Sequence, residues 1–211
     1  MFGIHDLPLF IVSGLLLNIT PGADSLYIVT RSVTQGTRAG MVAALGISTG
    51  CYVHIFAAAL GLSALLSTSE SVFMLVKLVG AAYLVYVGIS LLRHRPSIVR
   101  DSPAPVSPLP LRKIFTQGFF TNVLNPKVAL FFLAFVPQFI DSEAPSKALA
   151  FVLLGVIFNV NGTLWCLFLA WFAARIGSLG VRRKATAACL SRGTGALFIA
   201  LGLHLALEKP Q

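Results

Sequence analysis

The sequence contains few charged residues, and this scarcity excludes most soluble proteins. Asp, Glu, Lys and Arg together make up 11% of the 211 residues, against about 25% in a typical soluble domain. Hydrophobic residues reach 56% and the mean hydropathy is +0.86, so the chain cannot cover a water-facing surface with polar side chains. A cytosolic enzyme, a disulfide scaffold and an intrinsically disordered chain are excluded. The composition predicts an integral membrane protein.

Motifs for metal binding and catalysis are also missing from the sequence. Cys51, Cys166 and Cys189 show no metal-ligand spacing, and the first two lie in apolar runs, where cysteine packs as a small hydrophobic residue. There is no H-E-x-x-H motif and no second aspartate within an apolar segment. We therefore expect no cofactor, no metal site and no enzymatic activity.

Charged residues divide the chain into apolar segments of the length that crosses a bilayer, about 20 residues. The sixth such segment is long enough only if it begins near Ala185 and ends before Glu208. The N-terminus lacks the basic region of a cleaved signal peptide, so the first segment is expected to remain as a helix. The sequence thus predicts an all-α protein with six transmembrane helices, of which the first five comprise residues 7–30, 40–66, 71–92, 114–140 and 148–174.

A proline-rich segment, residues 94–113, separates two groups of three predicted helices. It contains five of the eleven prolines and is expected to be an extended linker between repeat one, residues 1–93, and repeat two, residues 114–211. Twelve of the sixteen basic residues lie on alternate connections, this one included. The positive-inside rule assigns those connections to the cytoplasm and both termini to the outside. The net charge of +9 is thereby explained by topology, and no nucleic acid is expected as a partner.

The two groups of helices carry the same marks at corresponding places. Residues 14–22 read GLLLNITPG and residues 118–127 read GFFTNVLNPK, so each has G-x-x-x-N followed by a proline. A cation, a glycine three residues later and an aromatic residue after another three begin at Lys77 and again at Arg192. Because each group has an odd number of helices, the second would run opposite to the first. The pattern predicts two inverted three-helix repeats, an arrangement common in secondary transporters.

Pro21 and Pro126 lie near the middle of their apolar segments. A proline there removes a backbone donor and opens the helix, so the first and fourth helices are expected to be broken near the bilayer midplane. Gly22 follows the first proline and Asn125 precedes the second. Opened helix ends at that depth offer N–H and C=O groups to a ligand. A kink used only for packing is the alternative interpretation.

Charged residues stand close to both predicted breaks. Asp24 is the only acid in any apolar segment, and Lys127 is the only cation near mid-depth, because Lys77 lies within about two turns of a helix start. A charge near the bilayer centre costs about 2.5–3.5 kcal/mol, so it normally has a partner and a role. We expect Asp24 and Lys127 to pair. The pair is either structural or, as we favour, binds the ammonium and carboxylate of a zwitterionic ligand.

The other candidate residues surround the breaks. Asn18 and Asn122 occupy the same place in the repeated motif, and Tyr27 lies one turn from Asp24. The full set of candidate substrate-binding or coupling residues is Asn18, Pro21, Gly22, Asp24, Tyr27, Lys77, Asn122, Asn125, Pro126 and Lys127.

Two further features of the second apolar segment are interpreted as structural. His54 could relay protons, but we favour a neutral histidine bonded within the helix bundle, because no other titratable group lies near it in the sequence. Gly46 and Gly50 form a small-x-x-x-small pair, which predicts close helix packing.

Several motifs occur in a fixed order along nearly the whole chain. They are T-P-G-A-D at residues 20–24, K-x-x-G-A-A-Y-L at 77–84, N-x-x-N-P-K at 122–127, F-V-P-Q-F at 135–139 and the segment 195–203. This set resembles the LysE/RhtB family of amino-acid exporters. The resemblance implies export of small amino acids or their derivatives from the cytoplasm, driven by the proton gradient, across a bacterial inner membrane. Ala23 departs from the family, which usually has the second proline of P-G-P there.

The residues alone leave other functions open. A metal or other cation exporter of similar architecture is one alternative, although one intramembrane acid and one central histidine provide few ligands. A membrane protein with a purely structural role is another. The expected partners are a small zwitterionic substrate, protons and the lipid bilayer. The identity of the substrate and the oligomeric state, a homodimer included, stay open.

Overall fold

The computed structural model describes residues 2–62, 108–141 and 143–177, together with positions 78, 82, 85, 86, 89 and 199. These residues are helical apart from short connections, and the single extended contact among them is an isolated bridge between Ile4 and Ile140. The third and sixth predicted segments, with Lys77 and the motif at Arg192, lie outside the described residues apart from those isolated positions. The all-helical class predicted from the sequence is confirmed for the described residues.

The first helix, α1 (Leu7–Ile19), ends where the sequence places its first proline motif. Thr20 has extended backbone angles (φ −62°, ψ 124°), as expected for a residue that precedes a proline. The Thr20 N–H and hydroxyl both donate to the carbonyl of Leu16, at 3.0 and 2.7 Å, and so close the last turn. The chain passes through Pro21 and an extended Gly22, and α2 (Ala23–Ala57) follows.

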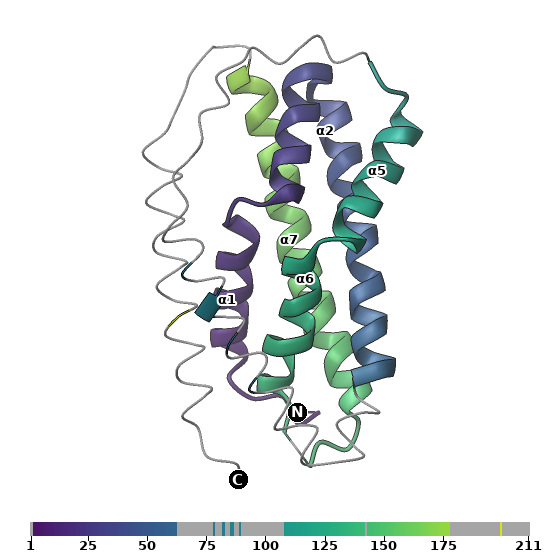
Figure 1. The fold of residues 1–211 in the computed structure, drawn as a ribbon. Coiled ribbons are helices and arrows are strands. Elements are labelled where there is room, and N and C mark those ends of the chain that lie inside the picture. The colour runs from purple at the N-terminus through teal and green to yellow at the C-terminus, as the bar shows by residue number, and fades with distance from the viewer. Residues whose placement is uncertain are drawn as a thin grey trace.

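Helix α2 reverses direction at Gly36. This residue has φ 81° and ψ 178°, a conformation that essentially only glycine adopts. In a continuous helix, residues eight apart are separated by about 12 Å, yet a Cβ on Gly40 would lie 3.0 Å from the Cβ of Ser32. Residues 23–35, the first arm, and 37–57, the second arm, therefore lie side by side (Figure 1). The turn falls between Arg31 and Arg38, where the sequence predicts the first connection.

The second described region begins with α5 (Leu111–Val123), which includes the last three residues that the sequence assigns to the linker. After Leu124 the chain bends by 44° into α6 (Pro126–Leu130). Asn125 caps α6, because its side chain accepts from the Lys127 N–H at 3.0 Å, and Pro126 fits the first turn, where no N–H is needed.

The helix that begins at α6 continues in altered geometry to the end of the predicted fourth segment. It runs through the π-helical η2 (Phe131–Phe135) and the 3₁₀-helical η3 (Val136–Phe139). The second arm of α2 likewise ends in a π-helical turn, η1 (Ala58–Leu62). The last described helix is α7 (Lys147–Gly177).

Two described helical segments, Ala23–Gly61 and Lys147–Arg175, are long and apolar enough to cross a membrane. The bent pair Leu111–Val123 and Pro126–Phe139 passes the same test when taken together. Residues 23–61 include the reversal at Gly36. The first arm, 23–35, is too short to cross alone and is preceded by α1, whereas the second arm with η1 is long enough to cross by itself.

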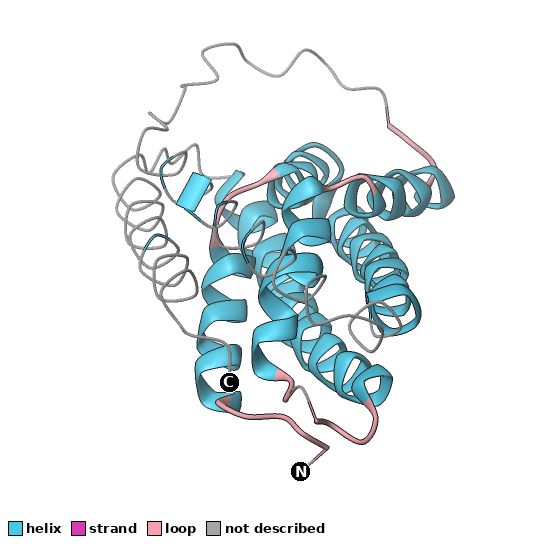
Figure 2. Ribbon diagram, turned by 60° about the horizontal axis from the view of Figure 1, so that its bottom comes forward, coloured by secondary structure: helices cyan, strands magenta, loops and turns pink. Residues whose placement is uncertain are grey.

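The helices form a bundle whose two ends are defined by contacts between distant segments (Figures 1 and 2). At one end, His5 N–H donates to the carbonyl of Phe139 at 3.2 Å, and Asp141 N–H donates to Gly3 at 2.8 Å. At the other end, the Gln35 side chain donates to the carbonyl of Leu109 at 3.0 Å, beside the Gly36 turn. We call these the N-terminal end and the Gly36 end. The α1–first arm segment runs from the N-terminal end to the Gly36 end, and α5–α6 runs the opposite way.

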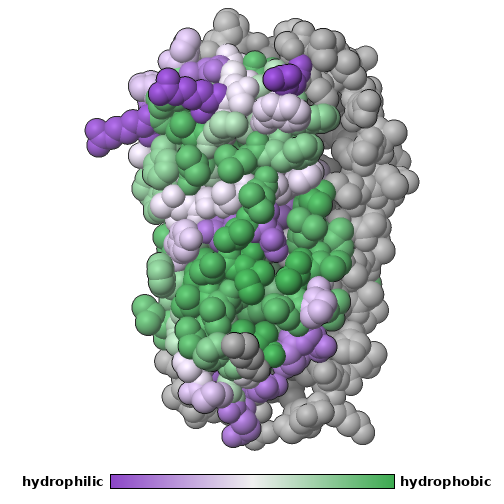
Figure 3. Space-filling view, turned by 180° about the vertical axis from the view of Figure 1, so that it is seen from behind, coloured by the Kyte–Doolittle hydropathy of each residue, from purple (hydrophilic) through white to green (hydrophobic). Residues whose placement is uncertain are grey.

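The outer surface suits lipid. Figure 3 shows one face, where hydrophilic side chains gather at both ends and hydrophobic side chains cover much of the surface between them, interrupted at mid-height by a narrower band of less hydrophobic side chains. Leu26, Leu124 and Leu164 are 63%, 76% and 63% exposed. Large apolar side chains this exposed on several helices indicate contact with a membrane or with other chains.

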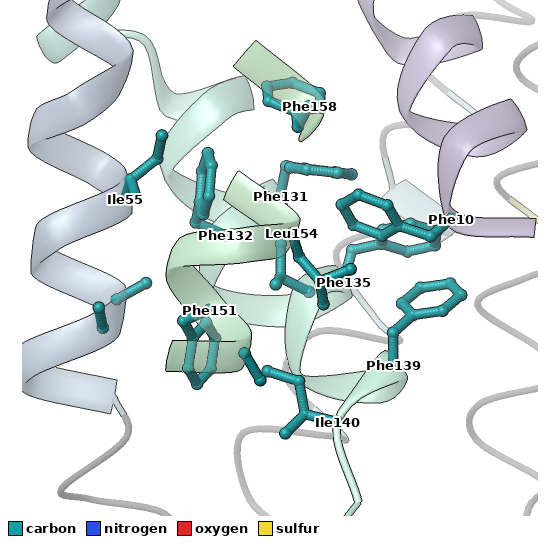
Figure 4. Close-up of a cluster of buried hydrophobic side chains, with 14 of the residues drawn as sticks. Phe10, Ile55, Phe131, Phe132, Phe135, Phe139, Ile140, Phe151, Leu154 and Phe158 are labelled. Carbon is teal, nitrogen blue, oxygen red and sulfur yellow. The ribbon is translucent and has the colours of Figure 1, made fainter. Parts of the chain in front are cut away.

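Two hydrophobic cores fill the bundle. The one toward the N-terminal end is rich in phenylalanine (Figure 4) and includes Phe10, Phe131, Phe135 and Phe158, with the rings of Phe131 and Phe158 stacked at 4.3 Å. The other, toward the Gly36 end, is built from small and branched residues: Ile28, Ala39, Ala43, Ala44, Ile47, Ile114 and Ala170. On α7 the first core ends at Phe158 and the second reaches Ala170, which leaves about three turns of helix between them.

Candidate functional site

A cavity of about 50 Å³ lies between the two hydrophobic cores, at the level where the first arm of α2 and α6 begin. This is small beside the roughly 300–1,000 Å³ of sites for drug-sized ligands. Half of the residues in its wall carry polar side chains. The wall is lined by Leu17, Asn18, Gly22, Asp24, Ser25, Ala44, Ile47, Ser48, Cys51, Asn122, Asn125, Lys127, Val128, Phe158, Asn159, Gly162, Thr163 and Cys166. A polar cavity enclosed by apolar packing is the arrangement of a binding site for a small polar compound.

Asp24 is placed at the cavity by the start of the first arm. It lies in the first turn of α2, where the helix dipole favours a negative charge. One carboxylate oxygen, Oδ2, accepts from Asn122 Nδ2 of α5 at 2.8 Å. The other, Oδ1, is buried and accepts no hydrogen bond from the described residues, and the same holds for Asn122 Oδ1. The site therefore has two neighbouring oxygen acceptors that no described group fills.

Lys127 enters the cavity from the first turn of α6 and reaches the end of α1. Its Nζ donates to the carbonyls of Leu17 at 2.6 Å and Thr20 at 2.9 Å. These carbonyls belong to the C-terminal end of α1, whose dipole favours a cation. An ammonium has three N–H donors, and the described contacts use two of them, so one remains for a further acceptor.

The two charged side chains do not pair with each other in this structure. Within the part of the chain that the structure describes, no ion pair joins Asp24 to Lys127, and each side chain is bonded to other groups. The direct Asp24–Lys127 pair expected from the sequence is therefore wrong for this conformation, although both residues line the same cavity. The reason is that backbone carbonyls of α1 and the amide of Asn122 satisfy the two charges separately.

The remaining candidate residues divide into those at the cavity and those away from it. Asn18, Gly22, Asn122 and Asn125 line it together with the two charged residues. Pro21 and Pro126 lie beside lining residues without lining the cavity themselves, and Lys77 is outside the described residues.

Tyr27 does not line the cavity, contrary to what its spacing from Asp24 suggests. Its hydroxyl donates to the carbonyl of Ile114 at 2.9 Å and lies 3.1 Å from Gln117 Oε1, which ties the first arm to α5. Arg31 extends this contact toward the Gly36 end by donating to Gln117 at 3.3 Å and to Gln35 at 3.2 Å. These residues close the seam between the first arm and α5 on the Gly36 side of the cavity.

His54 is bonded within the bundle, as the sequence predicts. Its Nε2 lies 3.0 Å from the carbonyl of Asn122, and its ring stacks on Phe132 at 6.3 Å. It therefore helps to hold the residue that donates to Asp24.

Four polar residues of the wall were not predicted from the sequence, Ser25 on the first arm and a bonded group of three. Ser48 from the second arm and Asn159 and Thr163 from α7 line the cavity and are bonded to one another. The signal was present, because Asn159 and Thr163 lie four residues apart, on one face of an otherwise apolar helix. Cys51 and Cys166, interpreted as packing residues, also line the cavity.

These features define a helical, multi-pass membrane protein with a charged polar cavity inside the bundle. The family model of the LysE type translocator matches residues 15–209, and the chain belongs to this family. It is a multi-pass bacterial membrane protein of a transporter family.

Relatives align with this chain over almost its whole length. An uncharacterised membrane protein of Pseudomonas aeruginosa is 31% identical, with 97% of this chain and 96% of the relative covered. The homoserine/homoserine lactone efflux protein of Salmonella typhimurium is 30% identical over 95% of each chain. The leucine efflux protein of the same species is 27% identical over 97% of this chain and 96% of the relative. No solved structure matches the chain.

Proposed function

We propose that this protein exports small amino acids or their derivatives from the cytoplasm, in exchange for protons. The observation that carries the proposal is the pattern of unused hydrogen-bonding groups in the cavity. Asp24 Oδ1 and Asn122 Oδ1 are unfilled acceptors, and the Lys127 ammonium has one unused donor. An amino acid presents the complementary groups, an ammonium with three donors and a carboxylate that accepts.

The relatives support this substrate class. The names of two of them state efflux of leucine and of homoserine or its lactone. All these compounds carry an amino group on the carbon atom next to a carbonyl group. A site for that common part would serve all of them, while the rest of the cavity wall distinguishes their side chains. The small size of the cavity favours a small compound.

Proton coupling follows from the chemistry of Asp24. A buried carboxylate can hold either a proton or a substrate ammonium, and binding of one excludes the other. Exclusive occupancy is what an exchanger needs, because each crossing then carries a substrate outward or a proton inward. Lys127 would keep the substrate carboxylate neutralised during the crossing.

The proposed architecture is six transmembrane helices in two inverted repeats, residues 1–93 and 114–211, with the cytoplasmic linker 94–113 between them. Two features support it. The α1–first arm segment and the α5–α6 segment run in opposite directions and each is interrupted next to a proline at the cavity. Both interruptions also bring a G-x-x-x-N asparagine, Asn18 or Asn122, to the cavity wall.

The Gly36 end is proposed to face the cytoplasm of a bacterial inner membrane, with both chain termini outside. Arg31, Arg38, Arg112, Lys113 and Arg175 lie on elements that meet at that end, as the positive-inside rule requires. A single cysteine replacing Lys113, in a variant without native cysteines, should react with an impermeant thiol reagent only from the cytoplasmic side. A cysteine replacing the exposed Ser146 should react only from outside, and labelling of both from one side would contradict the orientation.

The export proposal is tested with purified protein in vesicles loaded with a panel of labelled amino acids. A proton gradient directed opposite to the efflux should make at least one amino acid leave these vesicles faster than it leaves loaded vesicles without the protein. An uncoupler should remove this difference. Efflux of divalent cations in place of amino acids, measured with a metal-sensitive dye, would contradict the proposal in favour of the cation exporter.

A further inference from the structure

Ser48, Asn159 and Thr163 form a hydrogen-bonded group on the cavity wall, here called the hydroxyl cluster. They come from the second arm of α2 and from α7, whereas the charged residues come from the first arm and α6. Thr163 Oγ1 lies 2.7 Å from Ser48 Oγ and 2.7 Å from the Asn159 carbonyl. Ser48 Oγ lies 3.3 Å from Asn159 Oδ1, and Asn159 Nδ2 donates to the Ser48 carbonyl at 3.2 Å.

The hydroxyl cluster is short of one hydrogen. Three of its contacts join two oxygen atoms, so each needs a hydrogen from the hydroxyl of Ser48 or Thr163. Two hydroxyls supply two hydrogens, and one oxygen–oxygen contact is therefore always unfilled. Turning the Asn159 amide over does not remove the shortage, because it would place its oxygen against the Ser48 carbonyl, which only accepts.

The same cluster also has a donor in reserve. The Asn159 amide has two N–H groups, and its nitrogen makes one contact within the described residues, to the Ser48 carbonyl. Asn159 is buried, at 5% exposure, so bulk water does not take the second N–H. An unfilled acceptor beside an unused donor is complementary to a group that both donates and accepts, which is a hydroxyl.

We propose that Ser48, Asn159 and Thr163 recognise a hydroxyl on the substrate side chain, so that the exported compounds are short hydroxyl-bearing amino acids. This inference rests on the proposed function, in which Asp24 and Lys127 hold the amino and carboxylate groups and leave the side chain for another part of the wall. An aliphatic side chain of equal size would cover the cluster without completing its hydrogen bonds. Buried polar groups left unpaired weaken binding more than a missing apolar contact does.

Threonine and valine provide the matched test, because they have nearly the same shape and differ by a hydroxyl in place of a methyl group. Efflux of each is measured from vesicles that contain the wild-type protein. We expect kcat/KM for threonine to exceed that for valine by about tenfold, the effect of one buried hydrogen bond and the group that it satisfies. Serine against alanine repeats the comparison with a shorter side chain.

Thr163→Val removes one hydroxyl of the cluster with little change of shape. We expect it to reduce the threonine-to-valine ratio to within about twofold of one. Ser48→Ala should do the same and serves if Thr163→Val yields no folded protein. Thr49→Val is the control, because Thr49 is exposed on the same arm and its hydroxyl donates to Leu45 at 2.8 Å, away from the cavity. It should keep the wild-type ratio.

The outcomes separate the two proposals. A wild-type ratio of one or below, or an unchanged ratio in both Thr163→Val and Ser48→Ala, would overturn the hydroxyl site while amino-acid export stands. If the folded wild-type protein moves none of the four amino acids and none of a wider panel, the export proposal fails, and the hydroxyl site fails with it.

Discussion

Asp24→Asn and Lys127→Met are each expected to lower proton-driven efflux by about 10- to 100-fold, the loss that follows removal of one charge-assisted hydrogen bond to the substrate. Asp24 supplies an unfilled carboxylate oxygen, and Lys127 supplies the one N–H that the end of α1 does not use. The assay is efflux from vesicles at matched amounts of protein. Asp141→Asn and Lys113→Met, which remove exposed charges outside the cavity, are the controls and should transport normally.

Asp24→Asn and Lys127→Met should lose different parts of the transport activity. If Asp24 carries the coupling proton, Asp24→Asn should retain some exchange of substrate down its own gradient while it loses uphill efflux. Lys127→Met should lose both, because the substrate carboxylate has no other cation in the described cavity wall. Neither failure can be assigned to poor insertion, since replacing a charged side chain by a neutral one lowers the free-energy cost of placing it in the bilayer. Equal loss of both activities in Asp24→Asn would contradict its role in coupling.

Gly50→Val and Gly118→Val are expected to destabilise the folded protein by about 3 kcal/mol or more, at the upper end of overpacking effects. These glycines lie where the second arm of α2 packs against α5. A Cβ on Gly50 would lie 2.6 Å from the Phe119 carbonyl oxygen, and one on Gly118 would lie 2.7 Å from that of Ala43. The clashing atoms are backbone, so a whole helix must move to relieve them.

Melting in detergent and the yield of monodisperse protein measure this effect. Gly61→Val is the matched control, because a Cβ there meets nothing within 4 Å. Gly61→Val should melt close to the wild-type temperature. Equal melting temperatures of Gly50→Val and Gly61→Val would show that the second arm of α2 and α5 do not approach so closely. A Cβ on residue 50 would also lie 3.0 Å from the Cβ of Asn122, which lines the cavity. Any Gly50→Val protein that folds should therefore displace Asn122 and have impaired transport.

The fold was predictable where single residues determine the backbone or the membrane boundary. The scarcity of charge predicts membrane helices, the Gly46–Gly50 spacing predicts a close helix contact that α5 supplies, and the charges at Arg31 and Arg38 mark the turn at Gly36. The continuation of α6 through π and 3₁₀ geometry was not predictable. It depends on how Phe131, Phe135 and their neighbours pack against α1 and α7, which no local pattern specifies.

The sequence predicted many of the residues that line the candidate site, but not the hydrogen bonds that they form. Charges and asparagines beside prolines stand out in an apolar sequence, and the structure brings six of the ten candidates to one cavity. The partners of Lys127 are main-chain carbonyls, which leave no mark in a sequence, so a direct pair with Asp24 was the natural expectation. Ser48 was missed because a single serine in an apolar helix is common, and only its approach to Asn159 and Thr163 gives it a role.

Removing one charge from the protein and one from the ligand in the same binding measurement tests most directly whether Asp24 and Lys127 hold the two ends of the substrate. Binding of an amino acid, of its amino alcohol, which lacks the carboxylate, and of the matching acid without the amine is measured on purified wild-type protein, Asp24→Asn and Lys127→Met. We expect the wild type to bind the amino acid more tightly than either analogue. Lys127→Met should no longer distinguish the amino acid from the amino alcohol, and Asp24→Asn should no longer distinguish it from the acid. If both variants keep the wild-type discrimination, Asp24 and Lys127 do not hold the two ends of the substrate.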